Sequence, residues 1–358
     1  MSVSFKIESS TGSYAVEIET GLFRDVMQAR SHDIVIADER FIPELSLANV
    51  CALAVPANEP TKSLDALTDL ILRLRQMGAN RQTLLVALGG GVIQDIATFI
   101  ASVYMRGVEW VYMPTTVLAM VDSCIGGKSS INVGVYKNLI GTFHPPKMVK
   151  IDPALALTLT DEQRVSGLIE AAKICYCRGF EVFQEYIRCE PQASMSSQQM
   201  EMVIIASLKA KKWFIEIDEF DHKERLLLNF GHTFGHAIES ASHFNIVHGI
   251  AVGIGIQCAI ELGRELGRSY AGVGSVTLLE AHLGNLLNGI PGLAHEIRML
   301  SIAEIQRSFE GDKKHKTDFY TVVLLAESGA VELNSLQRTE QTMRTIEAAM
   351  IKALRRFC

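Results

Sequence analysis

The sequence predicts an α/β protein in which a parallel-sheet domain is followed by a mainly helical domain. Up to residue 158, short apolar runs alternate with helical stretches, as expected of buried parallel strands covered by helices on both faces. After residue 159 the periodicity is almost entirely helical until about residue 310. Because a chain of 358 residues is long enough for two hydrophobic cores, we expect one domain at 1–158 and another at 159–358.

The elements of the first domain follow from the spacing of its apolar residues. Alternation over 4–8 and 13–18, around a Ser-Thr-Gly-Ser turn, predicts an N-terminal hairpin. The predicted buried strands and the helices between them lie at 33–38, 50–57, 62–78, 83–91, 93–105 and 110–116. Sheets of this kind bind ligands at the carboxyl ends of their strands, so we expect a Rossmann-like nucleotide-binding domain.

The second domain begins with a helix signal. Thr160 and Gln163 form a T-x-x-Q capping box, which predicts a helix start near residue 161. Residues 247–262 are apolar on all sides and therefore predict a buried helix. A short strand pair is predicted at 319–325 and 329–333, followed by an amphipathic helix with apolar residues at 343, 346, 350 and 354.

Composition narrows the class of partner. The net charge of −6 gives no reason to expect nucleic acid or an anionic membrane. The start of the chain lacks an apolar secretion core, and no apolar run is long enough to cross a membrane. The seven cysteines contain no C-x-x-C pair, so we expect them to be reduced thiols. We therefore expect a cytoplasmic protein.

Two glycine-containing stretches suggest phosphate binding. The third predicted strand runs through Gly89–Gly91 directly into a helix, where backbone amides can approach a pyrophosphate, although a tight turn without a ligand would look the same. Residues 126–129 resemble the end of a P-loop, but Asp122 occupies the position of its first glycine, which excludes ATP binding by that motif. Lys128, Lys137 and Asn138 could still meet a phosphate, or lie in ordinary surface loops.

Histidines concentrate between residues 225 and 248. His232 and His236 are four residues apart and share one face of a helix, a spacing that can hold a metal but also arises by chance. His248 can join them only if the chain turns within 240–245, whose composition allows a turn. A catalytic zinc site would also need a carboxylate. Glu170 and Lys173 stand three apart on an otherwise apolar helix, where they form either part of such a site or a surface ion pair.

The order and spacing of several motifs resemble the sugar-phosphate cyclases, and within them most closely the dehydroquinate synthases. The resemblance extends from about residue 59 to residue 314. The motifs that carry it are GGGVIQD, MRG, PTT, VDSCIGGKSSIN, YKNLIG, SGLIEAAK, RLLLNFGHTFGHAIE and GDKK. One departure is Gln94, which stands where these enzymes usually have glycine in the first motif.

This resemblance implies a metal site and a cofactor site. The implied zinc ligands, which could also hold Co²⁺, are Glu170, His232 and His248. The residues implied to bind NAD are Asp38, Glu59, Lys62, Gly90, Gly91, Asp95, Thr115, Thr116 and Thr158.

The same resemblance implies the residues that meet the substrate. Those implied in catalysis are Asp122, Lys128, Lys173, Lys211, Arg225, Asn229 and His236. Further substrate contacts are implied for Arg106, Lys137, Asn138 and the pair Lys313 and Lys314, of which one is the counterpart. Arg106 resembles an arginine that reaches the site of a neighbouring subunit, which implies a homodimer.

The implied reaction is the cyclisation of 3-deoxy-D-arabino-heptulosonate 7-phosphate to 3-dehydroquinate, a step of the shikimate pathway. NAD oxidises a zinc-bound hydroxyl, phosphate is eliminated, the hydride returns, and an intramolecular aldol step closes the ring. Three alternatives remain open. The first is a related cyclase acting on sedoheptulose 7-phosphate or glucose 6-phosphate, the second is a metal-dependent polyol dehydrogenase, and the third is a binding protein without catalysis.

Overall fold

The computed structural model describes residues 2–30, 32–134 and 136–358, which form two compact units. The first unit comprises Met1–Leu159 and Ser196–Glu219, and the second comprises Thr160–Met195 and Phe220–Cys358. Helix α7 (Ser197–Ile217) therefore belongs to the first unit, which differs from the predicted second domain of 159–358. The reason is its buried face, which packs against two short helical turns of the first unit.

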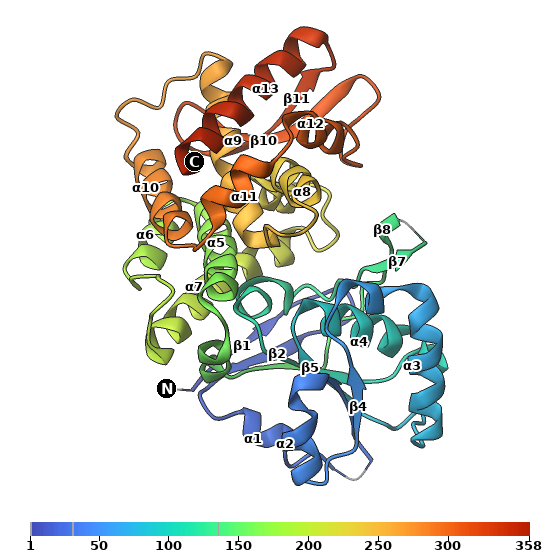
Figure 1. Ribbon diagram of the computed structural model, residues 1–358. Coiled ribbons are helices and arrows are strands. Elements are labelled where there is room, and N and C mark those ends of the chain that lie inside the picture. The colour runs from blue at the N-terminus through green and yellow to red at the C-terminus, as the bar shows by residue number, and fades with distance from the viewer. Residues whose placement is uncertain (1, 31, 135) are drawn as a thin grey trace. The chain divides into compact units, whose positions relative to one another are not determined.

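The first unit contains a seven-stranded sheet with strand order β1-β2-β9-β6-β5-β3-β4 (Figure 1). β1 and β2 pair antiparallel, and every other pair in this sheet is parallel. The predicted hairpin and the four predicted strands are confirmed. The strands are β1 (Val3–Ile7), β2 (Tyr14–Ile18), β3 (Ile34–Asp38), β4 (Ala52–Val55), β5 (Leu85–Gly89), β6 (Trp110–Pro114) and β9 (Met148–Ile151).

Helices pack on this sheet through apolar faces. In α3 the buried residues Leu67, Leu70 and Leu74 recur at helical spacing, and the Ser63 hydroxyl caps the first turn. α4 packs against β5 and β6. A small hairpin of β7 and β8 adds exposed side chains to the unit. The bounds are α1 (Phe23–Val26), α2 (Ile42–Leu47), α3 (Leu64–Gln76), α4 (Gly91–Val103), β7 (Ile131–Val133) and β8 (Tyr136–Ile140).

The second unit is mainly helical, with one two-stranded sheet (Figure 1). Both bonds of the predicted capping box at Thr160 and Gln163 are present. The second strand of the pair begins later than predicted, because Gly329 has a positive φ of 84° and lies in the turn. The elements are α5 (Asp161–Arg178), α6 (Phe180–Ile187), α8 (His232–Ala241), α9 (His248–Glu265), α10 (Gly274–Asn288), α11 (Leu293–Met299), α12 (Ile302–Glu310), β10 (Phe319–Leu325), β11 (Val331–Gln337) and α13 (Glu340–Leu354).

Helix α9 forms the centre of the second unit. It contacts α5, α8, α10, α13 and β10, and its residues are buried on all sides from Gly249 to Gly263. This burial confirms the prediction from its uniformly apolar sequence. In the described part of the chain, no helix combines the length and the apolarity that crossing a bilayer requires.

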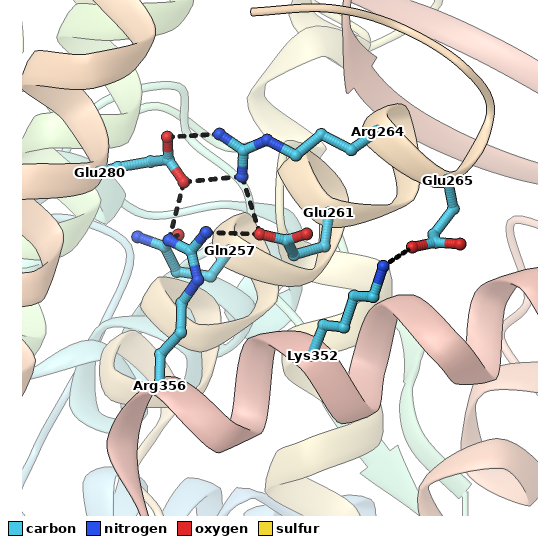
Figure 2. Close-up of polar contacts among 7 residues, drawn as sticks. All are labelled: Gln257, Glu261, Arg264, Glu265, Glu280, Lys352 and Arg356. Carbon is cyan, nitrogen blue, oxygen red and sulfur yellow. Dashed lines mark hydrogen bonds and ion pairs between the residues drawn. The ribbon is translucent and has the colours of Figure 1, made fainter.

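A charged network fastens the C-terminal end of α9 to α10 and to the end of the chain (Figure 2). Arg264 binds both carboxylate oxygens of Glu280, at 2.9 and 2.7 Å. Arg356 donates to Glu280 at 2.8 Å, to Gln257 at 3.2 Å and to Glu261. Burial alone would raise the pKa of Glu280, but the two arginines outweigh burial and lower it. Glu280 is therefore the acceptor that joins three segments of the second unit.

We expect Glu280→Gln to lower the free energy of unfolding by about 1 kcal/mol at pH 7, because it removes a bidentate pair in a partly exposed network. The carboxylate pKa is lower in the folded state than its ordinary value of 4.5. Its contribution is thus complete above that value and is lost as the pH falls through the folded-state pKa. Urea unfolding followed by circular dichroism at pH 7, 5 and 4 measures the difference, which should shrink only at the lowest pH.

Glu340→Gln serves as the control, since Glu340 and its partner Arg344 are mostly exposed. An equal loss of stability in the two variants would contradict the proposed importance of the network.

Candidate functional site

The glycine turn of the first unit lies at the carboxyl ends of parallel strands. Gly89, the last residue of β5, pairs with Pro114 of β6. Helix α4 begins at Gly91, and its first turn has no side-chain cap among the described residues. Gly90 is required by packing, since a Cβ atom there would lie 2.8 Å from Cγ2 of Thr116. The turn therefore offers helix N-terminal amides at a position where an anion can come close to the backbone.

Three further residues are predicted to bind the cofactor, and they differ in whether their side chains already make hydrogen bonds within the protein. Asp38 ends β3 and accepts from the Arg40 N–H at 3.2 Å. Thr158 donates to the carbonyl of Leu155 at 2.7 Å. Thr115 is fully buried just after β6, and its hydroxyl has no hydrogen-bond partner among the described residues. Of the three, Thr115 keeps unused hydrogen-bonding capacity.

A buried lysine connects several predicted residues beside this turn. Lys62 Nζ lies 3.0 Å from Asp95 Oδ2 and 3.6 Å from Glu59 Oε1, and it donates to Asn138 Oδ1 at 2.9 Å. Burial raises the pKa of Asp95 to about 6, although Lys62 favours its charged form. Asn132 extends the cluster by donating to Glu59 and accepting from the Asn138 N–H, each at 2.8 Å. We did not single out Asn132 from the sequence, although it lies within a motif that carries the resemblance.

Asp122 and Lys211 form a second polar pair in the first unit. Asp122 lies in a π-helical turn, and Lys211 reaches it from α7. Lys211 Nζ lies 2.5 Å from Asp122 Oδ1 and donates to the backbone carbonyl of Asp122. Two predicted residues that are 89 positions apart thus form a partly buried contact between opposite charges.

Other residues predicted in the first unit lie nearer its surface. Lys128 Nζ is 5.7 Å from the ring centroid of Phe143, and Lys137 is exposed on β8. Arg106 has a φ of 72° and follows Met105, whose φ is 49°. Two successive non-glycine residues in the left-handed region are energetically costly and are often found at functional positions. The strain therefore distinguishes Arg106 from ordinary surface arginines.

In the second unit, three histidines meet. Suitable ligand atoms of His232, His236 and His248 all lie within 4.8 Å of one another. The first two come from α8, and His248 is the first residue of α9. The chain turns between these helices, as predicted, through His243 and Phe244, which have φ values of 51° and 66°. This turn is what brings His248 back to the other two.

Glu170 of α5 faces the same cluster. It is fully buried, and neither carboxylate oxygen accepts a well-formed hydrogen bond within the described ranges. Positively charged and imidazole groups surround it nonetheless, with Lys173 Nζ at 2.5 Å, His248 Nε2 at 3.4 Å and His232 Nε2 at 3.7 Å. Burial would raise the pKa of Glu170, but Lys173 and His248 outweigh it and lower the pKa to about 2. Glu170 is therefore an ionised carboxylate directed at two imidazoles.

The other ring nitrogens orient these imidazoles. His248 Nδ1 lies 3.1 Å from Glu239 Oε2, and His232 Nδ1 lies 3.4 Å from the carbonyl of Phe230. Burial would lower the pKa of His248, but Glu170 and Glu239 raise it to about 10, whereas burial keeps the pKa of His232 well below its ordinary value. Carboxylates and carbonyls behind ligating histidines are typical of metal sites. Sequence reasoning missed Glu239, whose only signal was its place in GHTFGHAIE.

The donor set fits a divalent metal. Two imidazoles with their Nε2 atoms directed at one carboxylate correspond to the two-histidine, one-carboxylate set of catalytic zinc sites. His236 offers a third nitrogen in the same cluster, so the residues that the structure describes provide four candidate donors here.

The structure distinguishes the two neighbouring lysines near residue 314. Lys314 Nζ lies 2.9 Å from Asp312 Oδ2, whereas the side chain of Lys313 is exposed. Burial, together with the positive charges of Lys314 and His248, lowers the pKa of His236 to about 4. Of these two lysines, Lys314 is therefore the one whose charge acts on the histidine cluster.

Arg225 and Asn229 lie on a short 3-10 helix, Glu224–Asn229. Arg225 is only 5 % exposed, which is unusual for an arginine. The thiol of Cys177 on α5 donates to the Leu227 carbonyl at 3.4 Å and so ties this helix to the one that carries Glu170. The predicted Arg225 and Asn229 are thus held beside α5.

Glycines set the separation between α8 and α9. A Cβ atom on Gly255 would lie 2.2 Å from the Gly231 carbonyl oxygen and 2.6 Å from the Gly235 nitrogen. One on Gly235 would lie 2.9 Å from Cα of Val252. The two backbones are therefore nearly in contact, which places His248 close to His232.

Comparison with protein families gives two matches along the chain. Residues 52–166 match the family described as 3-dehydroquinate synthase N-terminal, and residues 167–315 match 3-dehydroquinate synthase C-terminal. A relative described as 3-dehydroquinate synthase, from Clostridium acetobutylicum, is 34 % identical over 257 residues, which cover 67 % of this chain and 72 % of that protein.

Two solved structures show the same fold across nearly the whole chain. One is 2-deoxy-scyllo-inosose synthase complexed with carbaglucose-6-phosphate, NAD⁺ and Co²⁺, with a TM-score of 0.83 and 23 % identity, covering 98 % of this chain and 100 % of that one. The other is the 2-epi-5-epi-valiolone synthase ValA from Streptomyces hygroscopicus subsp. jinggangensis 5008 with NAD⁺ and Zn²⁺ bound. Its TM-score is 0.75 and its identity 23 %, covering 96 % and 97 % of the two chains.

Proposed function

The chain belongs to the 3-dehydroquinate synthase family, and we propose that it converts 3-deoxy-D-arabino-heptulosonate 7-phosphate to 3-dehydroquinate and inorganic phosphate. The observation that carries this proposal is the buried carboxylate of Glu170 facing His232 and His248, with Lys173 2.5 Å from it. It combines metal donors with a cation for an anionic substrate, as a phosphate-eliminating cyclase requires.

We propose Glu170, His232 and His248 as the zinc ligands, with Co²⁺ as a possible replacement. The ionised state of Glu170 and the neutral state of His232 both favour a bound cation. His236, whose pKa is about 4, is then neutral at pH 7 and available to hydrogen-bond a substrate hydroxyl. When bound, zinc would polarise a substrate hydroxyl, and NAD would accept and return its hydride.

The proposed NAD site is the glycine turn and its surroundings. The uncapped start of α4 and the absence of space for a Cβ atom on Gly90 support binding of a pyrophosphate there. The strand-end position of Asp38 supports contact with a ribose hydroxyl. The other proposed contacts are Glu59, Lys62, Gly91, Asp95, Thr115, Thr116 and Thr158.

The substrate would be held by charge and hydrogen bonds. Arg225 can bind a carboxylate in a bidentate manner, a reason to prefer an acid substrate over a neutral sugar phosphate. Lys173 and Lys314 would bind anionic oxygens, as would the proposed residues of the first unit, Lys128, Lys137, Asn138 and Lys211. In the elimination, the carbon–oxygen bond to phosphate breaks, and a phosphate oxygen can take the proton lost by the adjacent carbon. Lysines stabilise the charge that develops on the leaving phosphate.

We further propose that the enzyme is a homodimer in which Arg106 reaches the substrate of the neighbouring subunit. The support is the strained conformation of Met105 and Arg106, with φ values of 49° and 72°. Such strain persists where a side chain must be held in a particular direction.

Related cyclases act on other sugar phosphates, and sedoheptulose 7-phosphate and glucose 6-phosphate are the alternative substrates. The buried Arg225, with Asn229 and His236, counts against them because a neutral sugar has no carboxylate for the arginine to bind. A polyol dehydrogenase would have no need for so many lysines directed at phosphate.

Purified protein with NAD and zinc should release one phosphate per molecule of 3-deoxy-D-arabino-heptulosonate 7-phosphate, without a net rise in absorbance at 340 nm. The absorbance stays flat because the hydride is returned within each turnover. Phosphate release and absorbance are measured for the heptulosonate and for both alternative sugar phosphates. Accumulating NADH would point to a dehydrogenase, and turnover of only a neutral sugar phosphate would overturn the proposed substrate.

We expect His248→Ala to weaken zinc binding by more than about a hundredfold, because it removes one ligand and leaves the Glu170 carboxylate without one of the two imidazoles that face it. His236→Ala should retain zinc within about tenfold while losing activity. Zinc affinity is measured by competition with a chromophoric chelator. His295→Ala, at an exposed histidine, is the control. If His236→Ala loses zinc and Glu170→Gln keeps it, the three histidines are the ligands instead.

Lys314→Ala should lower kcat/KM for the heptulosonate by about a hundredfold, because it removes a charge beside the histidine cluster. Lys313→Ala is the matched control and should stay within about twofold of the parent protein, since that side chain is exposed. Steady-state phosphate release gives both values. The reverse order of effects would assign the substrate contact to Lys313.

A further inference from the structure

The π-helical turn that carries Asp122 is held from outside by side chains. The turn spans Ala119–Ser123, and its wider winding leaves backbone carbonyls without the usual helical partners. Ser207 Oγ donates to the Val121 carbonyl at 2.8 Å, and Lys211 Nζ donates to the Asp122 carbonyl. Both donors come from α7. The conformation of the turn therefore depends on bonds from another element.

A third side chain holds the turn from a second element, α4. Gln94 Nε2 donates to the Ser123 carbonyl at 2.6 Å, and the Ser123 hydroxyl donates back to Gln94 Oε1 at 2.5 Å. Gln94 is only 3 % exposed, and its own N–H donates to the Gly90 carbonyl at 3.0 Å. Gln94 thus bonds the glycine turn through its backbone and the π-helical turn through its side chain.

The neighbours of this pair are proposed site residues. Asp95, next to Gln94, pairs with Lys62 at 3.0 Å, and Asp122, next to Ser123, pairs with Lys211 at 2.5 Å. We propose that Gln94 and Ser123 are positioning residues that couple the cofactor turn to Asp122, a role that rests on the function proposed above. Neither side chain needs to touch the substrate; the pair holds Asp122 at a set place relative to the glycine turn.

The chemistry of the pair requires an amide and a hydroxyl. The amide both donates to Ser123 and accepts from it, so a carboxylate or an apolar side chain at position 94 cannot make the two bonds. Losing both partners of a buried polar pair to apolar groups of similar shape is nearly neutral for stability. Joint replacement of Gln94 and Ser123 removes both side-chain groups but leaves the Ser123 backbone carbonyl without this donor, so we expect a small loss of stability. A positioning pair would in addition lose turnover in the folded protein, whereas a purely structural pair would not.

The test compares Gln94→Met, Ser123→Ala and the double variant. We expect kcat to fall about tenfold in Gln94→Met, which loses both bonds, and less in Ser123→Ala, which keeps the bond from Gln94 Nε2 to the backbone carbonyl. The double variant should fall no further than Gln94→Met, because Gln94 takes part in both bonds. KM and the Kd for NAD should change less than about threefold. Hydrogen exchange of peptides covering 119–124 should become faster in all three, and thermal midpoints identify any variant that fails to fold.

Thr98→Val is the matched control. Thr98 is another buried polar residue of α4, and its hydroxyl has no partner among the described residues. Its replacement should leave kcat and the exchange of 119–124 unchanged. Parent-like kcat and exchange in the folded Gln94 and Ser123 variants would overturn the proposal. So would a loss of NAD binding as large as the loss of kcat, since the pair would then serve the glycine turn alone.

Failure of the proposed function is recognised separately. It would appear as no phosphate release by the parent protein from any of the three sugar phosphates. Hydrogen exchange of peptides covering 119–124 requires neither NAD nor substrate, so it still tests whether Gln94 and Ser123 hold the π-helical turn. Parent-like exchange in the double variant would reject this role.

Discussion

The second unit depends on one buried charge, the carboxylate of Glu170. Removing an ionised carboxylate from water costs several kcal/mol unless partners surround it. Lys173 on the same helix supplies a full positive charge at 2.5 Å, and His232 and His248 bring imidazole nitrogens within 3.7 and 3.4 Å. Helices α5, α8 and α9 are therefore arranged around a single group. The same arrangement that makes this burial tolerable also makes the site suitable for a divalent cation.

Bringing two helices to one carboxylate constrains their packing. The backbones of α8 and α9 are nearly in contact at Gly231, Gly235 and Gly255, where a methyl group on any of the three would overlap its neighbours. The connection is short and includes two left-handed residues, His243 and Phe244, at a cost of about 1–3 kcal/mol each. The left-handed conformations of His243 and Phe244 thus lower stability, and the turn they form places His248 beside His232.

Local patterns predicted the parts of this molecule that depend on local physics. The strands and the capping box at Thr160 follow from short-range periodicity, and the turn that brings His248 back follows from the composition of 240–245. Contacts between residues far apart in the sequence produce no such local pattern. Helix α7 joins the first unit because its buried face, which includes Lys211, packs against turns distant in sequence. Glu239 has a role only once the α8–α9 turn brings it beside His248. The part played by Lys314 likewise depends on a tertiary contact.

Four of the proposed ligand-binding lysines have an acidic partner: Lys62 with Asp95, Lys173 with Glu170, Lys211 with Asp122 and Lys314 with Asp312. A buried lysine without a partner tends to lose its proton and with it the attraction for phosphate. A carboxylate partner keeps the lysine charged and fixes its direction before a ligand arrives, at the cost of competing with that ligand. In a chain of net charge −6, specificity for anions must therefore come from placement rather than from overall charge. That requirement explains why bonds that touch no ligand, such as those of Gln94 and Ser123, matter: they set where the paired groups lie.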